Sequence, residues 1–168
     1  MALREIITLP NPILRRKARK VTDFGKEFQE LVNDMIETMR DAPGVGLAAP
    51  QIAVSERLIV VEYSDDEDEE VSQKLYVIAN PEITSASDEM VKGIEGCLSV
   101  PGLVGEVERH ASITVKGLNR YGKPARVKAE GWLARIFQHE MDHLDGIVYP
   151  DRTDKVWKPA PDEEIPLD

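Results

Sequence analysis

Two histidines four residues apart give the clearest chemical signal in the sequence. The segment His139-Glu140-Met141-Asp142-His143 would place both imidazoles on one face of a helix, one turn or about 5.4 Å apart along its axis. Two imidazoles in this arrangement can bind one metal ion, and Glu140 is close enough to accept a proton from water at that ion. The pattern therefore predicts a metal centre with its own general base; the alternative is a pair of surface imidazoles on a solvated helix.

A catalytic metal site of this kind also needs a third protein ligand and one open position. The longer pattern H-E-x-x-H-x-x-G-x-x-H is matched at Gly146, but Tyr149 stands where its last histidine belongs. A carboxylate from a following helix would have to be Glu163 or Glu164, which lie in a proline-rich segment. His110 is the remaining histidine, and it fits an exposed strand edge equally well. None of these residues is a good third ligand.

The single cysteine, Cys97, is a better candidate for the third ligand. A lone cysteine is more often an inert buried side chain. Here, however, Gly96 precedes it and Pro101-Gly102 follows, which suits a ligand presented from a strand beside a turn. One thiolate and two imidazoles leave a tetrahedral site with one open corner, and they suit a metal such as iron(II) or zinc.

Hydrophobic periodicity and turn residues predict the elements that must position these side chains. An apolar stripe at helical spacing over 28–39 predicts a helix, with Asp23 as its N-cap and a stop at 41–44. A second helix should begin after residue 131 and end at 145, with Gly146 at its C′ position. The other predicted elements are strands at 57–63 and 75–79, a short strand between turns at 94–102, a hairpin of 111–118 and 125–129, and irregular segments at 1–22 and 44–51.

The composition describes a soluble, globular, single-domain protein. The chain has 168 residues, 42% of them hydrophobic and 31% charged, which is about the length of one domain. It carries 21 Lys and Arg against 31 Asp and Glu, and this net charge of −10 argues against DNA, RNA or an anionic membrane as the main partner. One cysteine cannot form an internal disulfide, and no stretch approaches the roughly 18 apolar residues of a membrane span. The acidic run 65–70 is expected to be a solvated loop and the acidic, proline-rich segment 158–168 a mobile tail.

Three motifs, in this order, resemble those of the peptide deformylase family. They are GVGLAAPQ at 44–51, EGCLS at 95–99 and QHEMDHL at 138–144. The helical motif alone also occurs in unrelated proteases, but all three at these separations are highly specific. The resemblance covers about 11–149 and implies an α+β fold with antiparallel sheets around the H-E-x-x-H helix. It also implies one catalytic domain over 1–157, followed by the tail.

The resemblance implies hydrolysis of the formyl group from the N-terminal formyl-methionine of new polypeptides, with release of formate. It implies one divalent metal ion, natively iron(II) in many members, although zinc, nickel or cobalt also suit these ligands. The residues that match the family's metal ligands are Cys97, His139 and His143, and the general base is Glu140.

Further roles carry over from the same motifs. Gln51 and the backbone N–H of Leu98 would line the oxyanion hole, and Gly46 would contact the substrate backbone. Arg109 matches an arginine regarded as structural in the family. An apolar pocket is also needed for the methionine side chain, and the candidates for it are Val45, Trp132 and Ile136, the last about one turn before His139 on the same helix.

The expected partners are N-formyl-methionyl nascent peptides, with a transient ribosome contact and with no DNA or membrane partner. Some family members dock on the ribosome through a basic C-terminal helix, whereas the acidic residues of segment 162–168 would repel ribosomal RNA. The absence of an evident targeting segment predicts a cytoplasmic location.

Two other functions fit parts of the pattern. A zinc peptidase that shares only the H-E-x-x-H helix would cleave internal peptide bonds and would be indifferent to Cys97. A non-catalytic protein could use the same three ligands only to hold its fold together, so that metal loss would unfold it and Glu140→Gln would have no functional effect.

Overall fold

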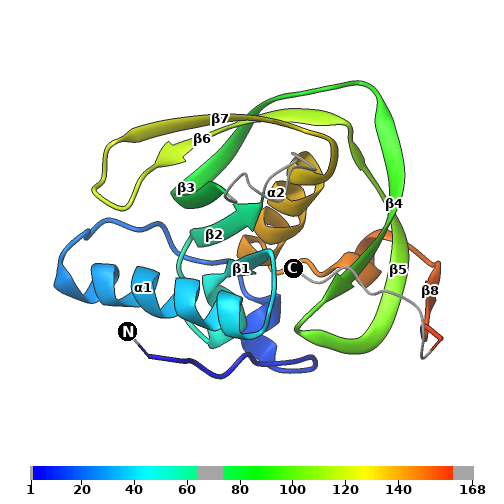
Figure 1. The fold of residues 1–168 in the computed structure, drawn as a ribbon, viewed down its shortest axis with the longest axis horizontal. Helices are drawn as coiled ribbons and strands as arrows, with labels where there is room; N and C mark the ends of the chain where they lie inside the picture. The colour runs from blue at the N-terminus through cyan, green and yellow to red at the C-terminus, as the bar shows by residue number, and fades with distance from the viewer. Residues whose placement is uncertain (1, 64–73, 161–168) are drawn as a thin grey trace.

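The computed structural model describes residues 2–63 and 74–160 (Figure 1). In these ranges the chain forms two antiparallel sheets and two long helices, which confirms the predicted α+β class. The helices are α1 (Lys26–Asp41) and α2 (Gly131–Leu144), with the 3₁₀ helices η1 (Pro12–Arg15), η2 (Ala49–Ile52) and η3 (Tyr149–Arg152). The strands are β1 (Gly46–Ala48), β2 (Leu58–Tyr63), β3 (Lys74–Ala86), β4 (Met90–Cys97), β5 (Val100–His110), β6 (Ser112–Leu118), β7 (Pro124–Glu130) and β8 (Val156–Trp157).

The larger sheet has the strand order β1-β2-β3-β6-β7 and lies between the two helices. Side chains alternate between its faces. In β2, Ile59 and Val61 pack in the cluster around α2, whereas Leu58 and Val60 pack in the cluster around α1. Strand β2 is therefore buried on both faces, which explains the unbroken apolar run that marks it in the sequence.

The smaller sheet has the strand order β4-β5-β8 and carries Cys97 into the interior of the protein. Strands β4 and β5 form a long hairpin, which Figure 1 shows curving along one side of the protein. Cys97 is the last residue of β4, and Leu98 and Ser99 form the turn that follows. The cysteine is thus presented from a strand beside a turn, as predicted.

Helix α1 contains the predicted stripe but begins at a different residue. Its N-cap is Gly25, so the prediction of Asp23 as the N-cap is wrong. The Asp23 carboxylate instead accepts a hydrogen bond from the Gly25 N–H at 2.8 Å and stabilises the turn that leads into the helix. The buried face includes Phe28, Met35 and Met39.

Helix α2 is the central element of the fold, because every side chain from 133 to 140 is buried. Its C-terminal end is held by neighbours from the first half of the chain. The Leu144 carbonyl accepts hydrogen bonds from the Ala18 N–H at 2.8 Å and from Arg57 Nη1 at 3.0 Å. Gly146 follows with a φ of 76°, the left-handed conformation that its predicted C′ position requires.

Two other sequence predictions need correction. Segment 44–51 is not an irregular loop, because it contains β1, paired with β2 through Gly46 and Val61, and then η2. Segment 94–102 is not one short strand but the turn end of the β4–β5 hairpin. Exposed side chains on this hairpin, such as Val91 and Ile94, obscure the alternation that marks a half-buried strand.

Other predictions are confirmed or lie outside the described residues. The hairpin predicted at 111–118 and 125–129 corresponds to β6 and β7. The acidic run 65–70 and residues 161–168 of the tail are outside the described ranges, so the predictions for them remain predictions, as does the domain boundary at 157. None of the helices in the described ranges has the length and apolar character needed to cross a membrane.

Candidate metal centre

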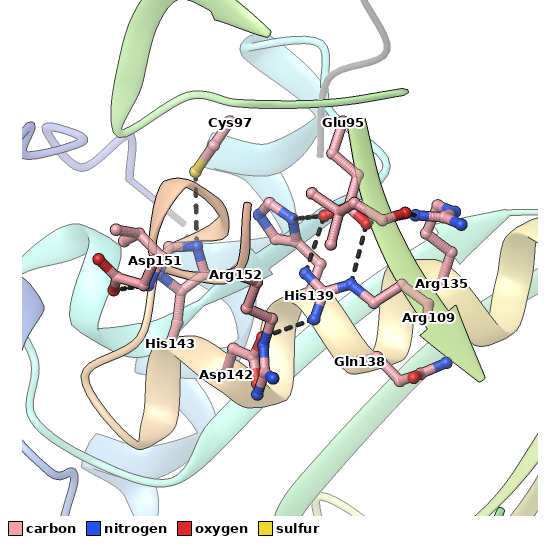
Figure 2. A network of polar contacts seen from close by, with 12 residues as sticks. Glu95, Cys97, Arg109, Arg135, Gln138, His139, Asp142, His143, Asp151 and Arg152 are labelled. Carbon is pink, nitrogen blue, oxygen red and sulfur yellow. Dashed lines mark hydrogen bonds and ion pairs between the residues drawn. The ribbon is translucent and has the colours of Figure 1, made fainter. Parts of the chain in front are cut away.

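The side chains of Cys97, His139 and His143 meet in the interior of the protein. Each offers a ligand atom, and these three atoms lie within 4.8 Å of one another. Cys97 Sγ is 3.4 Å from His143 Nε2, and a dashed line marks this contact in Figure 2. The cysteine comes from the end of β4 and both histidines from α2, and all three side chains are buried.

The chemistry and spacing of this donor set fit a divalent metal ion. In a tetrahedral site with a metal–sulfur bond of about 2.3 Å and a metal–nitrogen bond of about 2.05 Å, the two ligand atoms would lie about 3.6 Å apart. The observed Sγ–Nε2 separation of 3.4 Å is close to this value. His139 Nδ1 lies 2.8 Å from a carboxylate oxygen of Glu95. Because a carboxylate accepts, Nδ1 donates there, and Nε2 is the nitrogen of His139 that can bind a metal.

Glu95 is the centre of a buried network of charges (Figure 2). One of its oxygens accepts hydrogen bonds from Arg109 Nη2 at 2.8 Å and from His139. The other accepts from Arg109 Nε at 2.9 Å and from Arg135 Nη1 at 2.6 Å. Arg109 also donates through Nη1 to Asp142 at 2.6 Å. The network therefore connects the β4–β5 hairpin to helix α2 beside a metal-ligand candidate.

The charges in this network reinforce one another. Burial by itself raises the pKa of Glu95, but hydrogen bonds and positive charge from Arg109, with His139, outweigh burial and hold the pKa well below its usual range. Burial by itself lowers the pKa of Arg109, but Glu95 and Asp142 outweigh it and raise the pKa. Glu95 is therefore a fixed carboxylate that orients the His139 ring.

Glu140 is fully buried and lies against Gly46 of strand β1. A Cβ atom added to Gly46 would lie 2.6 Å from Glu140 Oε2 and 3.0 Å from Glu140 Cδ. The Gly46 backbone is fixed by its pairing with Val61 in β2. The missing side chain at residue 46 therefore makes the space that the Glu140 carboxylate occupies.

We expect Gly46→Ala to lower kcat for the predicted hydrolysis by about 10²-fold, since a catalytic group misplaced by about 1 Å, here the Glu140 carboxylate, costs that much in rate. The added methyl group displaces the end of a flexible side chain, so Tm should change little. Gly25→Ala is the matched control, because its methyl group would also meet a carboxylate oxygen, Asp23 Oδ1 at 2.9 Å, but far along the chain from α2. Steady-state kinetics and thermal melts measure both effects. Wild-type kcat in Gly46→Ala would show that Glu140 does not need this space.

Gln51 is fully buried and lies beside Cys97. Its Oε1 accepts a hydrogen bond from the Ala48 N–H at 3.0 Å, which fixes the orientation of the amide. Its Nε2 is consequently 3.7 Å from Cys97 Sγ and donates to Ser99 Oγ at 3.2 Å. Leu98, half-buried, follows Cys97 in the same turn. The structure thus brings both residues assigned to the oxyanion hole next to the cysteine.

The N-terminal segment contacts both sides of the site, although the sequence predicts it only as irregular chain. The Ile7 N–H donates to the carbonyl of Gln51 at 2.8 Å, and the Leu9 N–H donates to the carbonyl of Ser99 at 3.0 Å. No periodicity or motif marks these contacts, because they depend on backbone groups that every residue carries.

The three residues predicted for the substrate side-chain pocket belong to one hydrophobic region of the structure. Val45, Trp132 and Ile136 all pack in the hydrophobic cluster around α2. Trp132 lines a cavity of about 620 Å³ between the start of α2 and strand β4, together with Gly93 and Arg135. Ile136 is instead buried in the core and Val45 partly buried against it.

Tyr149, which stands at the third-histidine position of the longer motif, and His110, the remaining histidine, make other contacts in the structure. Tyr149 is buried, and its ring stacks on the His139 ring with their centroids 6.2 Å apart. His110 is half-buried at the end of β5 with its Nδ1 2.8 Å from the Ser87 carbonyl, so the interpretation of an exposed edge residue is wrong. Gln138 also holds His110, because its amide bonds both the N–H and the carbonyl of that residue at 3.0 Å.

The fold and the site together place the protein among α+β proteins with a buried Cys-His-His centre. The two histidines of this centre lie on an H-E-x-x-H helix, and the cysteine lies at the end of a strand. Residues 3–158 match the family model described as polypeptide deformylase. The peptide deformylase of Natranaerobius thermophilus is 48% identical over 158 residues, which cover 94% of this chain and 97% of the relative. That of Symbiobacterium thermophilum is 53% identical over 152 residues, 90% of this chain and 67% of the relative.

Solved structures give the same result. The crystal structure of a peptide deformylase from Legionella pneumophila has a TM-score of 0.84 and 46% identity, covering 91% of this chain and 87% of that one. That of Ehrlichia chaffeensis peptide deformylase in complex with actinonin has a TM-score of 0.86 and 39% identity, covering 92% and 91%. The chain belongs to the polypeptide deformylase family, the hydrolases that remove the N-formyl group from nascent polypeptides.

Proposed function

We propose that the reaction takes place at the centre formed by Cys97, His139 and His143, with these three side chains as the ligands of the divalent metal. The observation that carries this proposal is the convergence of one sulfur and two ring nitrogens within 4.8 Å in a buried site. Such a metal, when bound, would act as a Lewis acid and lower the pKa of water. Iron(II) is the proposed native ion, and zinc, nickel and cobalt are alternatives that the donor set also accepts.

Glu140 is proposed to move the proton. Hydrolysis forms a C–O bond between water and the formyl carbon and breaks the C–N bond, so that formate and an amino group leave. The water must lose a proton and the departing nitrogen must gain one. Glu140 follows His139 directly on α2 and is buried against Gly46, so its carboxylate is held close to the centre and can perform both transfers.

Gln51 and Leu98 are proposed to stabilise the negative charge that develops on the formyl oxygen. The fixed amide of Gln51 presents its Nε2 toward Cys97, and the Leu98 backbone N–H belongs to the turn that follows the cysteine. A donor of this type contributes about 3 kcal/mol to a transition state. Gly46 is proposed to contact the substrate backbone, since β1 is an edge strand of its sheet.

The substrate is proposed to be an N-formyl-methionyl nascent peptide. Val45, Trp132 and Ile136, which share the hydrophobic cluster around α2, would contact the methionine side chain. The cytoplasm is the proposed location, because formylated chains leave the ribosome there and because a thiol ligand such as Cys97 stays reduced there.

Formate release from formyl-Met-Ala-Ser tests the proposed function. We expect release by the wild type and losses of several orders of magnitude in Cys97→Ser and Glu140→Gln. Formyl-Gly-Ala-Ser should have a lower kcat/KM than the methionine peptide, because it leaves the pocket unfilled. Cleavage of internal peptide bonds with Cys97→Ser active would identify a zinc peptidase instead. Unfolding on metal removal, with no formate release by any variant, would identify a structural metal site.

A further inference from the structure

The basic residues of this acidic protein are concentrated in two segments. Ten of the 21 Lys and Arg residues fall within 15–20 and 112–129, and these two segments contain no Asp or Glu. The rest of the chain therefore carries 11 basic residues against 31 acidic ones. The net charge of −10, which argues against RNA as the main partner, conceals this separation of charge.

The β6–β7 hairpin places most of its cations on one face. Lys116 lies opposite Arg126 and Thr114 lies opposite Lys128, and residues directly opposite in a ladder share a face. The other face carries Val115 and its neighbours and packs toward α2. The basic side chains are exposed. They therefore point to the side of the sheet opposite to the helix that carries the metal ligands.

Acidic residues border this face without covering it. Glu82 of β3 lies opposite Lys116 in the neighbouring ladder, and Glu130 ends β7. Leu118 continues the same face as Lys116 and packs in the cluster around α1. The exposed basic part of the sheet thus begins where α1 stops covering it, at the top of the molecule in Figure 1.

The chain that follows the first basic segment reaches the same hairpin. Asn80 of β3 bonds the Val21 backbone through both ends of its amide, at 2.8 and 2.9 Å. Phe24 packs against Gly122 in the β6–β7 turn, since a Cβ at that glycine would lie 3.1 Å from the ring. Val21 and Phe24 belong to the cluster around α1, on the same side of the sheet as Leu118. The chain just after the first basic segment therefore borders the hairpin. The segment itself packs at the C-terminal end of α2, where Ala18 lies in the cluster around that helix and its N–H bonds the Leu144 carbonyl.

The turn of the hairpin is anchored and carries an exposed aromatic ring. Arg120 donates to Gln29 Oε1 and to Asn33 Oδ1 of α1, both at 2.8 Å. Next to it, Tyr121 has 70% of its surface exposed. An exposed aromatic ring on an anchored turn, among cations, is the combination that stacks on unpaired bases of RNA.

We propose that this side of the protein is the surface that contacts ribosomal RNA while the enzyme works on nascent chains, an inference that rests on the proposed function. We call it the basic band; it is the exposed face of the β6–β7 hairpin with its turn, and its residues are Lys116, Tyr121, Lys123, Arg126 and Lys128. Phosphates attract the band, whereas they repel the remaining surface, so the charge separation orients the enzyme. Because the hairpin face points away from α2, this contact leaves the metal centre open to the peptide. The band offers one exposed aromatic side chain and no apolar stripe, which fits RNA better than membrane insertion.

Binding to purified ribosomes at several salt concentrations tests the proposal. The variant is the triple charge reversal Lys116→Glu, Arg126→Glu and Lys128→Glu. The control reverses three exposed lysines outside the band, Lys26, Lys155 and Lys158, and so has the same net charge. We expect the band variant to lose at least about tenfold in affinity and to reduce the slope of log K against log salt by about 2 to 3, while the control stays within about threefold of wild type.

Three further measurements separate this proposal from others. Formate release from formyl-Met-Ala-Ser should be equal in the wild type and in both triple variants. A wild type that releases no formate would contradict the proposed function, whereas the ribosome-binding comparison tests the basic band. Tyr121→Ala should weaken binding to single-stranded ribosomal RNA but not to polyphosphate, which has no bases. Equal losses in the two triple variants, or wild-type ribosome binding by the band variant, would overturn the proposal. So would tighter wild-type binding to vesicles of anionic lipid than to RNA.

Discussion

Glu140→Gln should lower kcat for formyl-Met-Ala-Ser by about 10²–10⁴-fold, the usual contribution of a general acid–base group. The amide keeps the shape of the carboxylate but cannot accept the proton of water or return it to the departing nitrogen. Because Glu140 is fully buried against Gly46, no solvent-exposed carboxylate can take its place there. KM should change little if the residue acts in the chemical step.

Metal content and a remote variant make this result interpretable. Elemental analysis should find the same metal stoichiometry in Glu140→Gln as in the wild type, since the proposed ligands are Cys97, His139 and His143. Glu30→Gln is the matched control, because its carboxylate is exposed on α1, 61% at the side chain, and should leave kcat unchanged. If Glu140→Gln retained more than about a tenth of wild-type activity, the assignment of the general base would be wrong.

Glu95→Ala should produce the largest loss of stability, about 3–5 kcal/mol, because it leaves Arg109 and Arg135 as buried cations without their anion. For a chain of this length that corresponds to a fall in Tm of roughly 6–20 °C. The variant also removes the acceptor that orients His139, so metal affinity should fall about 10–100-fold. Thermal melts and metal titration measure the two effects separately.

Glu106→Ala is the matched control for this prediction. Glu106 lies on the paired strand β5, but its ion pair with Lys155, 3.3 Å long, is at the surface and should contribute no more than about 1 kcal/mol. The pH dependence gives a second check. Because the folded protein holds the pKa of Glu95 below its ordinary value of 4.5, this carboxylate stabilises the fold fully above that pH and progressively less as pH falls below it. The gap in Tm between wild type and Glu95→Ala should therefore be constant near neutrality and narrow below about pH 4.5. A gap that widens in acid would contradict the charge assignment.

Local patterns in the sequence were enough to predict much of this fold. The four-residue spacing of His139 and His143 fixes their common helix face, and the stripe over 28–39 fixes the buried face of α1. Gly146 marks the end of α2 because its φ of 76° suits glycine. Each of these predictions depends on neighbours within a few turns of one element.

The parts that escaped prediction depend on residues far apart in the chain. Glu95 and Arg135 are 40 positions apart, and nothing near either residue indicates that their charges will meet. Likewise, Gly46 can be recognised as part of a motif, but its contact with Glu140 exists only once β1 packs on α2. The sequence predicts only one short strand where the end of the β4–β5 hairpin lies, since exposed apolar side chains on this hairpin break the usual alternation.

The hydrogen bonds from Ile7 and Leu9 to the two loops of the site have a consequence for biosynthesis. They join the beginning of the chain to residues 51 and 99, and the centre is completed only by α2, which ends at residue 144. A ribosome-bound fragment that stops before this helix therefore lacks two of the three donor side chains. Metal acquisition must therefore wait until α2 has been made, and contacts over such long separations slow the final collapse of the chain.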